Sequence, residues 1–276
     1  MSAGHSLQDV KEIGKRIRKK IIQQVTWAGC GHPGGSLSGT DILSTLYFRK
    51  MRFNAQDPQW ADRDRFVLSK GHCTPLLYAT LSEAGYFSDD LLTSFRKIDS
   101  KLQGHPEKDY LPGIEMSTGA LGQGLAIGHG MALGLKLNNS PGRVFVMMGD
   151  GEIQEGMIWE AAMSAGHYKT DNLVGIIDAN GQQIDGNVKD IMDVAPLADK
   201  WAAFGWHTQV IDGHDYEAID AALDTAINVT GKPAIIICKT VKGKGVSFME
   251  GVVKFHGTAP SVEQSEIALQ EIEEKY

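Results

Sequence analysis

The chain has 276 residues, a formal net charge of −7 and 42% hydrophobic residues, a composition typical of a globular protein. The negative charge argues against nucleic acid as a partner, and no apolar run approaches the length of a membrane-crossing helix. The three cysteines show no Cys-x-x-Cys pairing, which argues against a disulfide framework and a zinc site. Because residues 1–6 lack the layout of a signal peptide, we expect a cytoplasmic protein.

Predicted helices and strands alternate along the chain. Ser6 is expected to cap a first helix that ends near Trp27, and Ser261 starts a capping-box sequence for a last helix that reaches roughly Glu273. The other expected helices are 39–49, 74–84, 89–95, 122–137, 157–168, 197–204 and 216–228, and the expected strands are 144–148, 173–178, 207–211 and 234–239. The alternation predicts an α/β fold with a doubly wound parallel sheet. With no linker or composition break, we expect one domain over residues 1–276.

The most informative pair of residues follows two neighbouring predicted strands. Asp150 stands in a Gly-Asp-Gly sequence after strand 144–148, and Asn180 stands in an Asn-Gly sequence after strand 173–178. Because the carboxyl ends of parallel strands meet at one edge of a sheet, these side chains should lie close together. Both sequences are also common in turns, but the pair, its spacing and both strand contexts favour a site. Hard oxygen donors beside glycines suit Mg²⁺ or Ca²⁺ holding a diphosphate.

This stretch resembles the Gly-Asp-Gly…Asn signature of thiamine diphosphate enzymes. The resemblance implies that Asp150, the Asn180 side chain and the main-chain carbonyl of Gln182 bind Mg²⁺, for which Ca²⁺ or Mn²⁺ can substitute. It also implies that Asn180, Gly151 and Glu152 lie at the cofactor diphosphate. The second Asn that many members carry is missing, which matches the transketolase form of the signature.

Four histidines stand beside glycine in stretches that we interpret as loops. They are His32, His72, His105 and His256, and two of them are followed by proline. Such sequences predict loops, which carry function more often than cores do. A single histidine of this kind is more often an ordinary surface or buried residue. Four of them in one chain are poorly explained by chance.

These four contexts resemble transketolase over nearly the full length of the chain, and so do the stretches 117–124 and 239–245. The resemblance implies that three catalytic histidines, His32, His105 and His256, contact substrate hydroxyls. Stabilising alkoxides and moving protons near neutral pH is chemistry that suits histidine.

The remaining matches imply contacts with the cofactor. His72 is expected at the diphosphate, with His256 beside it. The backbone expected to face the aminopyrimidine ring belongs to Gly119, Ala120 and Leu121. The family usually has proline in place of Ala120, which we interpret as a mild departure. Lys242 lies in a Lys-Gly-Lys-Gly strip, where a loop that closes over a phosphate is favoured over a solvated loop.

Full-length transketolases are much longer than this chain, and the resemblance stops with their first domain. The glutamate that activates the cofactor and most of the arginines that bind the substrate phosphate lie in the family's later domains. The resemblance therefore implies the N-terminal subunit of a split transketolase, which transfers a two-carbon ketol group from a ketose phosphate to an aldose. Its partner would be a C-terminal subunit with the pyrimidine-binding and C-terminal domains, in an α2β2 assembly.

Two alternatives stay open at this point. One is another thiamine diphosphate enzyme, either a deoxyxylulose-phosphate synthase, which shares part of the pattern, or the α subunit of a 2-oxo acid dehydrogenase. The other is a non-catalytic module that binds metal and diphosphate and regulates a partner, because half a site could bind without turnover. An activity assay on the reconstituted pair of subunits would separate an enzyme from a regulatory module.

Overall fold

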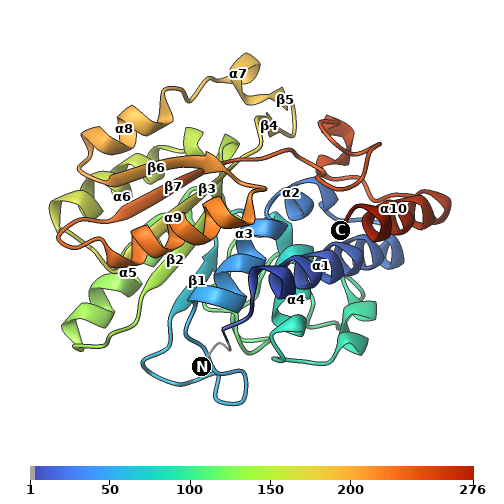
Figure 1. Ribbon diagram of the computed structural model, residues 1–276, viewed down its shortest axis with the longest axis horizontal. Helices are drawn as coiled ribbons and strands as arrows, with labels where there is room; N and C mark the ends of the chain where they lie inside the picture. Colours follow the sequence, from blue (N-terminus) through green and yellow to red (C-terminus); the bar gives the residue numbers. More distant parts are fainter. Residues whose placement is uncertain (1–3) are drawn as a thin grey trace.

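A parallel sheet of five strands forms the middle layer of the computed structural model, which describes residues 4–276 (Figure 1). In their order across the sheet, the strands are β1 (Arg65–Leu68), β2 (Val144–Gly149), β3 (Leu173–Ala179), β7 (Ala234–Lys239) and β6 (His207–Asp212). A short antiparallel pair, β4 (Gln182–Gln183) and β5 (Gly186–Asn187), follows β3. The predicted α/β class with a parallel sheet is confirmed.

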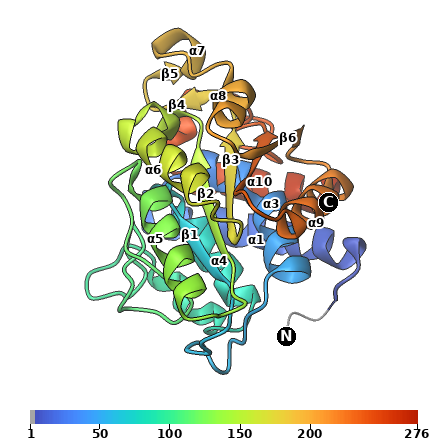
Figure 2. The ribbon, with the colours of Figure 1, turned by 90° about the vertical axis from the view of Figure 1, so that its left-hand side faces the viewer.

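Helices cover both faces of this sheet (Figure 2). One face carries α1 (Leu7–Ala28), α3 (Thr40–Thr45), α4 (Thr74–Glu83) and α9 (Tyr216–Asn228), with α10 (Val262–Lys275) packed on α1. The other face carries α5 (Gln123–Leu137), α6 (Gly156–His167) and α8 (Leu197–Ala203). The remaining helical segments are α2 (Pro33–Ser38), α7 (Val188–Ile191), η1 (Leu46–Lys50), η2 (Gly71–Cys73), η3 (Asp89–Ser94), η4 (Gly151–Gln154) and η5 (Val253–His256).

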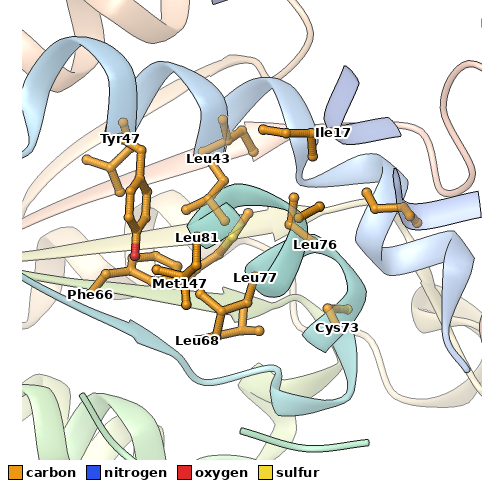
Figure 3. Packing of buried hydrophobic residues seen from close by; sticks show 14 of the residues in the cluster. Ile17, Leu43, Tyr47, Phe66, Leu68, Cys73, Leu76, Leu77, Leu81 and Met147 are labelled. Atoms are coloured by element: carbon orange, nitrogen blue, oxygen red, sulfur yellow. The ribbon is translucent and has the colours of Figure 1, made fainter. Parts of the chain in front are cut away.

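The strands contribute side chains to two hydrophobic cores, one on each face of the sheet. Side chains alternate along each strand, so Ile236 of β7 joins the core under α1 while Ile235 and Ile237 join the core under α5 and α6. In the first core, Leu43 and Leu77 pack around Phe66, Leu68 and Met147 (Figure 3). Burying a side chain of this size stabilises a fold by about 1.5–3 kcal/mol, so strands with apolar residues on both faces belong in the middle layer.

Both predicted capping boxes are present. Ser6 accepts a hydrogen bond from the Asp9 amide while the Asp9 carboxylate accepts one from the Ser6 amide, and α1 begins at the next residue. Ser261 does the same with Gln264 at the start of α10, which ends at Lys275 and not at Glu273. The first three residues, on which the signal-peptide prediction partly rests, lie outside the described part of the chain. Within residues 4–276, no helix is long and apolar enough to cross a membrane.

Four local predictions need correction. Strand β1 was not expected, because it has only four residues, begins with Arg65 and follows the charged residues Arg63 and Asp64. A helix, α2, begins at Pro33 where we expected only a loop, since proline is well suited to the first turn of a helix. The predicted helix 39–49 divides into α3 and the π-helical η1, and the predicted helix 89–95 is the 3₁₀ segment η3.

The small residues of α5 allow this helix to pack closely on the sheet. Gly124 and Gly128 both face the strand side, where a β-carbon at Gly124 would overlap Ser69 and one at Gly128 would overlap Val146 of β2. Ala132 is fully buried on the same face. These small residues therefore permit close packing of α5 on the sheet.

Alanine substitutions at two glycines of α5 form a matched pair. A methyl group at Gly128 would collide with Val146, so we expect Gly128→Ala to lower the free energy of unfolding by about 1–3 kcal/mol. Nothing lies within 4 Å of a β-carbon added at Gly134, so Gly134→Ala should raise it by up to about 1 kcal/mol through helix propensity. Urea denaturation of both variants measures the difference, and equal effects would contradict the packing argument.

Candidate functional site

The loops at the carboxyl ends of β1, β2, β3 and β7 enclose a pocket of about 350 Å³. The predicted site residues that line it are His32, His72, His105, Gly119, Leu121, Asp150, Gly151, Glu152, Asn180, Gln182, Lys242 and His256. Ala120 is exposed and does not line the pocket. A larger groove of about 710 Å³ shares Asp150, Asn180, Gln182 and Lys242 but none of the histidines. The predicted chemistry therefore gathers in the smaller pocket.

Asp150 caps the short segment η4 directly after β2. Its carboxylate accepts hydrogen bonds from the Gly151 amide at 3.0 Å and from the Gly181 amide at 2.6 Å, and the residue is 5% exposed. The second contact joins the loop after β2 to the loop after β3, as the sheet-edge prediction requires. Burial, with the nearby charge of Asp178, raises the pKa of Asp150 to about 6 although both amides oppose the shift.

Asn180 and Gln182 line the same pocket as Asp150 and contribute oxygen atoms to it. The Asn180 side-chain oxygen accepts a hydrogen bond from the Gln182 amide at 3.1 Å. The main-chain carbonyl of Gln182 accepts one from Lys242 Nζ at 3.0 Å. A carboxylate, an amide oxygen and a main-chain carbonyl are the donor types that Mg²⁺ and Ca²⁺ prefer, so the chemistry of this set fits a hard cation.

Three of the predicted histidines pack against one another. The ring centres of His32 and His72 are 5.1 Å apart, those of His32 and His256 are 5.5 Å apart, and those of His72 and His256 are 5.1 Å apart. His105 lies against Gly119, where an added β-carbon would be 3.0 Å from its ring. The sequence places these four residues on separate segments, and the fold brings all of them to one pocket.

The same four histidines favour their neutral forms. Burial and the neighbouring cations lower the pKa of His32 to about 4 and that of His256 to about 3. Burial, with His32 and His256 nearby, lowers the pKa of His72 well below its ordinary value. Burial and the charge of Arg96 also lower the pKa of His105. A neutral imidazole has one N–H donor and one acceptor nitrogen, so these rings can bind hydroxyl groups.

Lys242 reaches into the pocket from the loop after β7. Its ammonium group contacts the Gln182 carbonyl and lies 2.7 Å from His256 Nδ1, and the residue is 3% exposed. Burial lowers the pKa of Lys242, while the carboxylates of Asp178 and Asp150 act in the opposite direction. A cation beside His72 and His256 is well placed to attract a phosphate group.

The carboxylate of Glu152 is used inside the protein. It accepts hydrogen bonds from the Ser69 hydroxyl, from the Gly122 amide at 3.0 Å and from the Gly149 amide at 3.1 Å. Burial raises its pKa although these donors oppose the shift. Glu152 thus joins the loops after β1 and β2 to the start of α5. It lines the pocket, but both of its carboxylate oxygens already accept hydrogen bonds within the protein.

Sequence reasoning missed a buried ion pair at the pocket, which Lys70 lines. Lys70 Nζ lies 2.5 Å from the Asp178 carboxylate, and neither residue is more than 2% exposed. Lys70 also donates to the Gly35 carbonyl at 2.7 Å. Burial acts to lower the pKa of Lys70, but Asp178 outweighs it and the net shift is upward. Only the burial of both residues distinguishes them from ordinary charged residues of the sequence.

Arg96 is a second residue that the sequence did not indicate. It has a positive φ of 57°, which non-glycine residues adopt infrequently, and it packs beneath Gly104, next to His105. Its charge lowers the pKa of both His32 and His105, and its Nε is a buried atom with no hydrogen-bond partner. No motif surrounds Arg96, so only the fold reveals its position.

Comparison with known proteins gives a consistent result. Residues 10–273 match the family described as transketolase, thiamine diphosphate binding domain. The chain is 43% identical to the 6-deoxy-6-sulfo-D-fructose transketolase subunit SqwG of Clostridium sp. (strain MSTE9), covering 97% of each chain. It is 43% identical to one of the subunits of apulose-4-phosphate transketolase from Phocaeicola vulgatus, covering 95% of this chain and 92% of that one. The crystal structure of Campylobacter jejuni transketolase superimposes with a TM-score of 0.93 at 36% identity, over 98% of this chain and 43% of that one.

The raised pKa of Asp150 predicts a stability effect of known sign. The folded-state pKa of about 6 lies above the ordinary value of 3.8, so the carboxyl group favours folding below pH 4 and this contribution is lost as the pH rises through 6. Asp150→Asn cannot ionise, so relative to wild type it should gain about 2–3 kcal/mol between pH 4 and pH 7, less about 1 kcal/mol for a lost hydrogen bond. Urea denaturation of the metal-free chain across this range measures the gain.

Asp178→Asn provides the contrasting control. Burial acts to raise the pKa of Asp178, but Lys70 and its other hydrogen-bond partners outweigh it, so its ionised form is favoured in the folded state. The amide at this position should destabilise the chain by about 3–5 kcal/mol at pH 7, because the Lys70 charge loses its partner. A uniform loss of stability in Asp150→Asn at every pH would contradict the argument.

Proposed function

This chain belongs to the transketolase family, and we propose that it is the thiamine diphosphate-binding, N-terminal subunit of a two-subunit transketolase, folded as one domain. It would transfer a two-carbon ketol group from a ketose phosphate to an aldose. Two relatives of nearly the same length are themselves named transketolase subunits, whereas the chain spans 43% of a longer transketolase from Campylobacter jejuni. These lengths support a division of the enzyme between two polypeptides.

The observation that carries the proposal is that one pocket contains a carboxyl group with a raised pKa and histidines with lowered pKa values. Asp150 has a raised pKa, so its carboxylate lacks a cation. His32, His72 and His256 have lowered pKa values, so the cluster lacks an anion. A metal ion bound to a diphosphate supplies both charges, and the two sets of residues would then stabilise opposite ends of the same ligand.

Within this proposal, Asp150, the Asn180 side chain and the Gln182 carbonyl bind Mg²⁺. Lys242, His72 and the Gly151 backbone would contact the diphosphate. When bound, thiamine diphosphate supplies the nucleophilic carbon and the electron sink for breaking a bond next to a carbonyl. Loss of Mn²⁺ binding in Asp150→Asn, measured by electron paramagnetic resonance, tests the metal assignment. Retention of Mn²⁺ by this variant would overturn it.

The chain's own side chains would bind the sugar and move its protons. His32, His105 and His256 contact substrate hydroxyls in this proposal, and His32 Nδ1 is a buried nitrogen with no hydrogen-bond partner in the protein. The negative charge of a diphosphate would raise the pKa of each ring toward neutrality, because an opposite charge favours the protonated form. Histidines with pKa values near neutral can both accept and return a proton.

We also propose that the donor sugar carries an anionic group at the end far from the transferred carbons. The names of two relatives refer to a phosphorylated and a sulfonated sugar, which share a terminal anion. A C-terminal subunit with a pyrimidine-binding domain would complete the cofactor site and supply the activating glutamate, in an α2β2 assembly. In this proposal the backbone of residues 119–121 would face the aminopyrimidine ring, and Gly119 and Leu121 line the pocket whereas Ala120 does not.

The first test is dependence on the partner. We expect the purified chain with thiamine diphosphate and Mg²⁺ to show no ketol transfer, because the activating glutamate lies on the other subunit. Addition of the C-terminal subunit should produce turnover, measured by coupled detection of the released aldose phosphate. Turnover by the chain alone would contradict the two-subunit proposal. No turnover by a pair that binds the cofactor would favour a regulatory module.

Alanine variants of the histidines test how their roles divide. His32→Ala and His105→Ala should lower kcat of the reconstituted pair by about 10²–10⁴ and leave the cofactor concentration for half activity unchanged, since they lose contacts with reacting hydroxyls. His72→Ala should mainly raise that cofactor concentration, and His256→Ala should show both defects. Steady-state kinetics over a range of thiamine diphosphate concentrations separates these effects.

His167→Ala is the matched control for this series, because His167 is exposed at the end of α6 and does not line the pocket. Its kinetics should equal those of the wild type. Near-normal rates in both His32→Ala and His105→Ala would assign these two residues to ordinary loop positions.

A further inference from the structure

Lys242 occupies a loop whose position depends on residues far from the pocket. The loop follows β7, and its side of the pocket is fixed by hydrogen bonds from the Gly243 amide to the Gly34 carbonyl at 3.0 Å and from the Gly251 amide to the Lys242 carbonyl at 2.9 Å. The opposite side of the loop faces the turn between β6 and α9 (Figure 1). His214 stands in this turn and does not line the 350 Å³ pocket.

His214 connects the loop to a buried carboxylate. Its Nδ1 lies 2.8 Å from an oxygen of Asp41, and its Nε2 lies 2.8 Å from the amide nitrogen of Val241, the residue before Lys242. A main-chain amide can only donate, so Nε2 must be the unprotonated acceptor. Nδ1 therefore carries the proton and donates it to Asp41. The two contacts select one tautomer and fix the ring between α3 and the loop.

The same oxygen of Asp41 is also connected, through Arg18, to the loop at Lys244. It accepts a hydrogen bond from Arg18 at 2.7 Å, and Asp41 and Arg18 are 1% and 0% exposed. Arg18 Nε in turn donates to the Lys244 carbonyl at 3.4 Å, and its guanidinium lies 4.3 Å from the centre of the Tyr276 ring. One buried carboxylate thus secures the loop on both sides of Lys242.

We propose that His214 is a positioning residue for the site, which holds Lys242 in place through the Val241 amide. The inference rests on the proposed function, since it takes Lys242 to be a contact of the diphosphate. Loss of the His214 acceptor would free the main chain beside Lys242 while leaving every residue of the pocket unchanged. We expect this loss to lower cofactor affinity and not kcat, because Lys242 is not assigned to a step in which protons move.

Two conservative variants separate this role from a general contribution to folding. In His214→Gln, the amide oxygen can take the place of Nε2 and accept from Val241. In His214→Asn, the shorter amide can take the place of Nδ1 and reach Asp41, but it cannot reach Val241. Positioning of the loop therefore predicts that the Gln variant resembles wild type and the Asn variant does not.

The first readout is cleavage of the full chain by trypsin after Lys239, Lys242 and Lys244, followed by mass spectrometry. We expect about tenfold faster cleavage at these residues in His214→Asn, within about twofold of wild type in His214→Gln, and an unchanged rate after Lys136 outside the loop. The second readout is the thiamine diphosphate concentration for half activity of the reconstituted pair. It should rise about three- to tenfold in the Asn variant, with kcat at saturation unchanged.

Equal behaviour of the two variants, or an unchanged loop in both, would overturn the proposal. If either variant fails to fold, ¹⁵N NMR of histidine-labelled wild-type protein decides, because a proton on Nε2 of His214 is incompatible with the contact to Val241. A wild-type pair that does not bind thiamine diphosphate would contradict the proposed function. The tryptic pattern and the tautomer would still test the position of the loop.

Discussion

The buried ion pair of Lys70 and Asp178 joins the ends of strands that are not neighbours. Lys70 follows β1 and Asp178 lies in β3, with β2 between them. Lys70 also binds the Gly35 carbonyl of α2, and the Asp178 carboxylate accepts hydrogen bonds from Ser38, Asn180 and Thr240. Each of two buried charges is stabilised mainly by the other, so removal of one lowers the free energy of unfolding by about 3–5 kcal/mol. This pair and its hydrogen-bond partners connect α2 with the segments after β1, β3 and β7 at the floor of the pocket.

The pairing of Lys70 with Asp178 also affects the charges that the other residues of the pocket experience. Because Asp178 is already neutralised by Lys70, it cannot also supply a full negative charge to Lys242 and the histidines above it. Burial lowers the pKa values of the imidazoles, and the charges of Arg96 and Lys242 act in the same direction. The pKa of Asp150 is shifted upward instead, because the carboxyl group is buried and accepts hydrogen bonds from only two main-chain amides. Under the proposed function, the pocket is thus preorganised for a ligand that carries both signs of charge.

Local sequence signals were sufficient for most of the fold. Ser6 and Ser261 place the starts of α1 and α10 because their capping partners lie three residues away, and the strands of the sheet centre are continuous apolar runs. Asp150 and Asn180 could be paired because each directly follows such a run. Lys70, Arg96 and His214 could not be found in this way. Their roles depend on burial and on contacts that no local pattern records, such as Lys70 with Gly35, 35 residues away, and His214 with Asp41, 173 residues away.

The order of the strands explains why distant segments meet at this pocket. After β3 the chain continues to α8, which packs on one face of the sheet, and after β7 it continues to α10, which packs into the core of the other face. Adjacent parallel strands whose connections leave in opposite directions open a crevice at their carboxyl ends, which is where ligands bind in such sheets. Asn180 leaves β3 on one side of this crevice and Lys242 leaves β7 on the other. An amide and an ammonium group separated by 62 residues in the sequence therefore face the same space, and the contact of Lys242 with the Gln182 carbonyl closes the crevice.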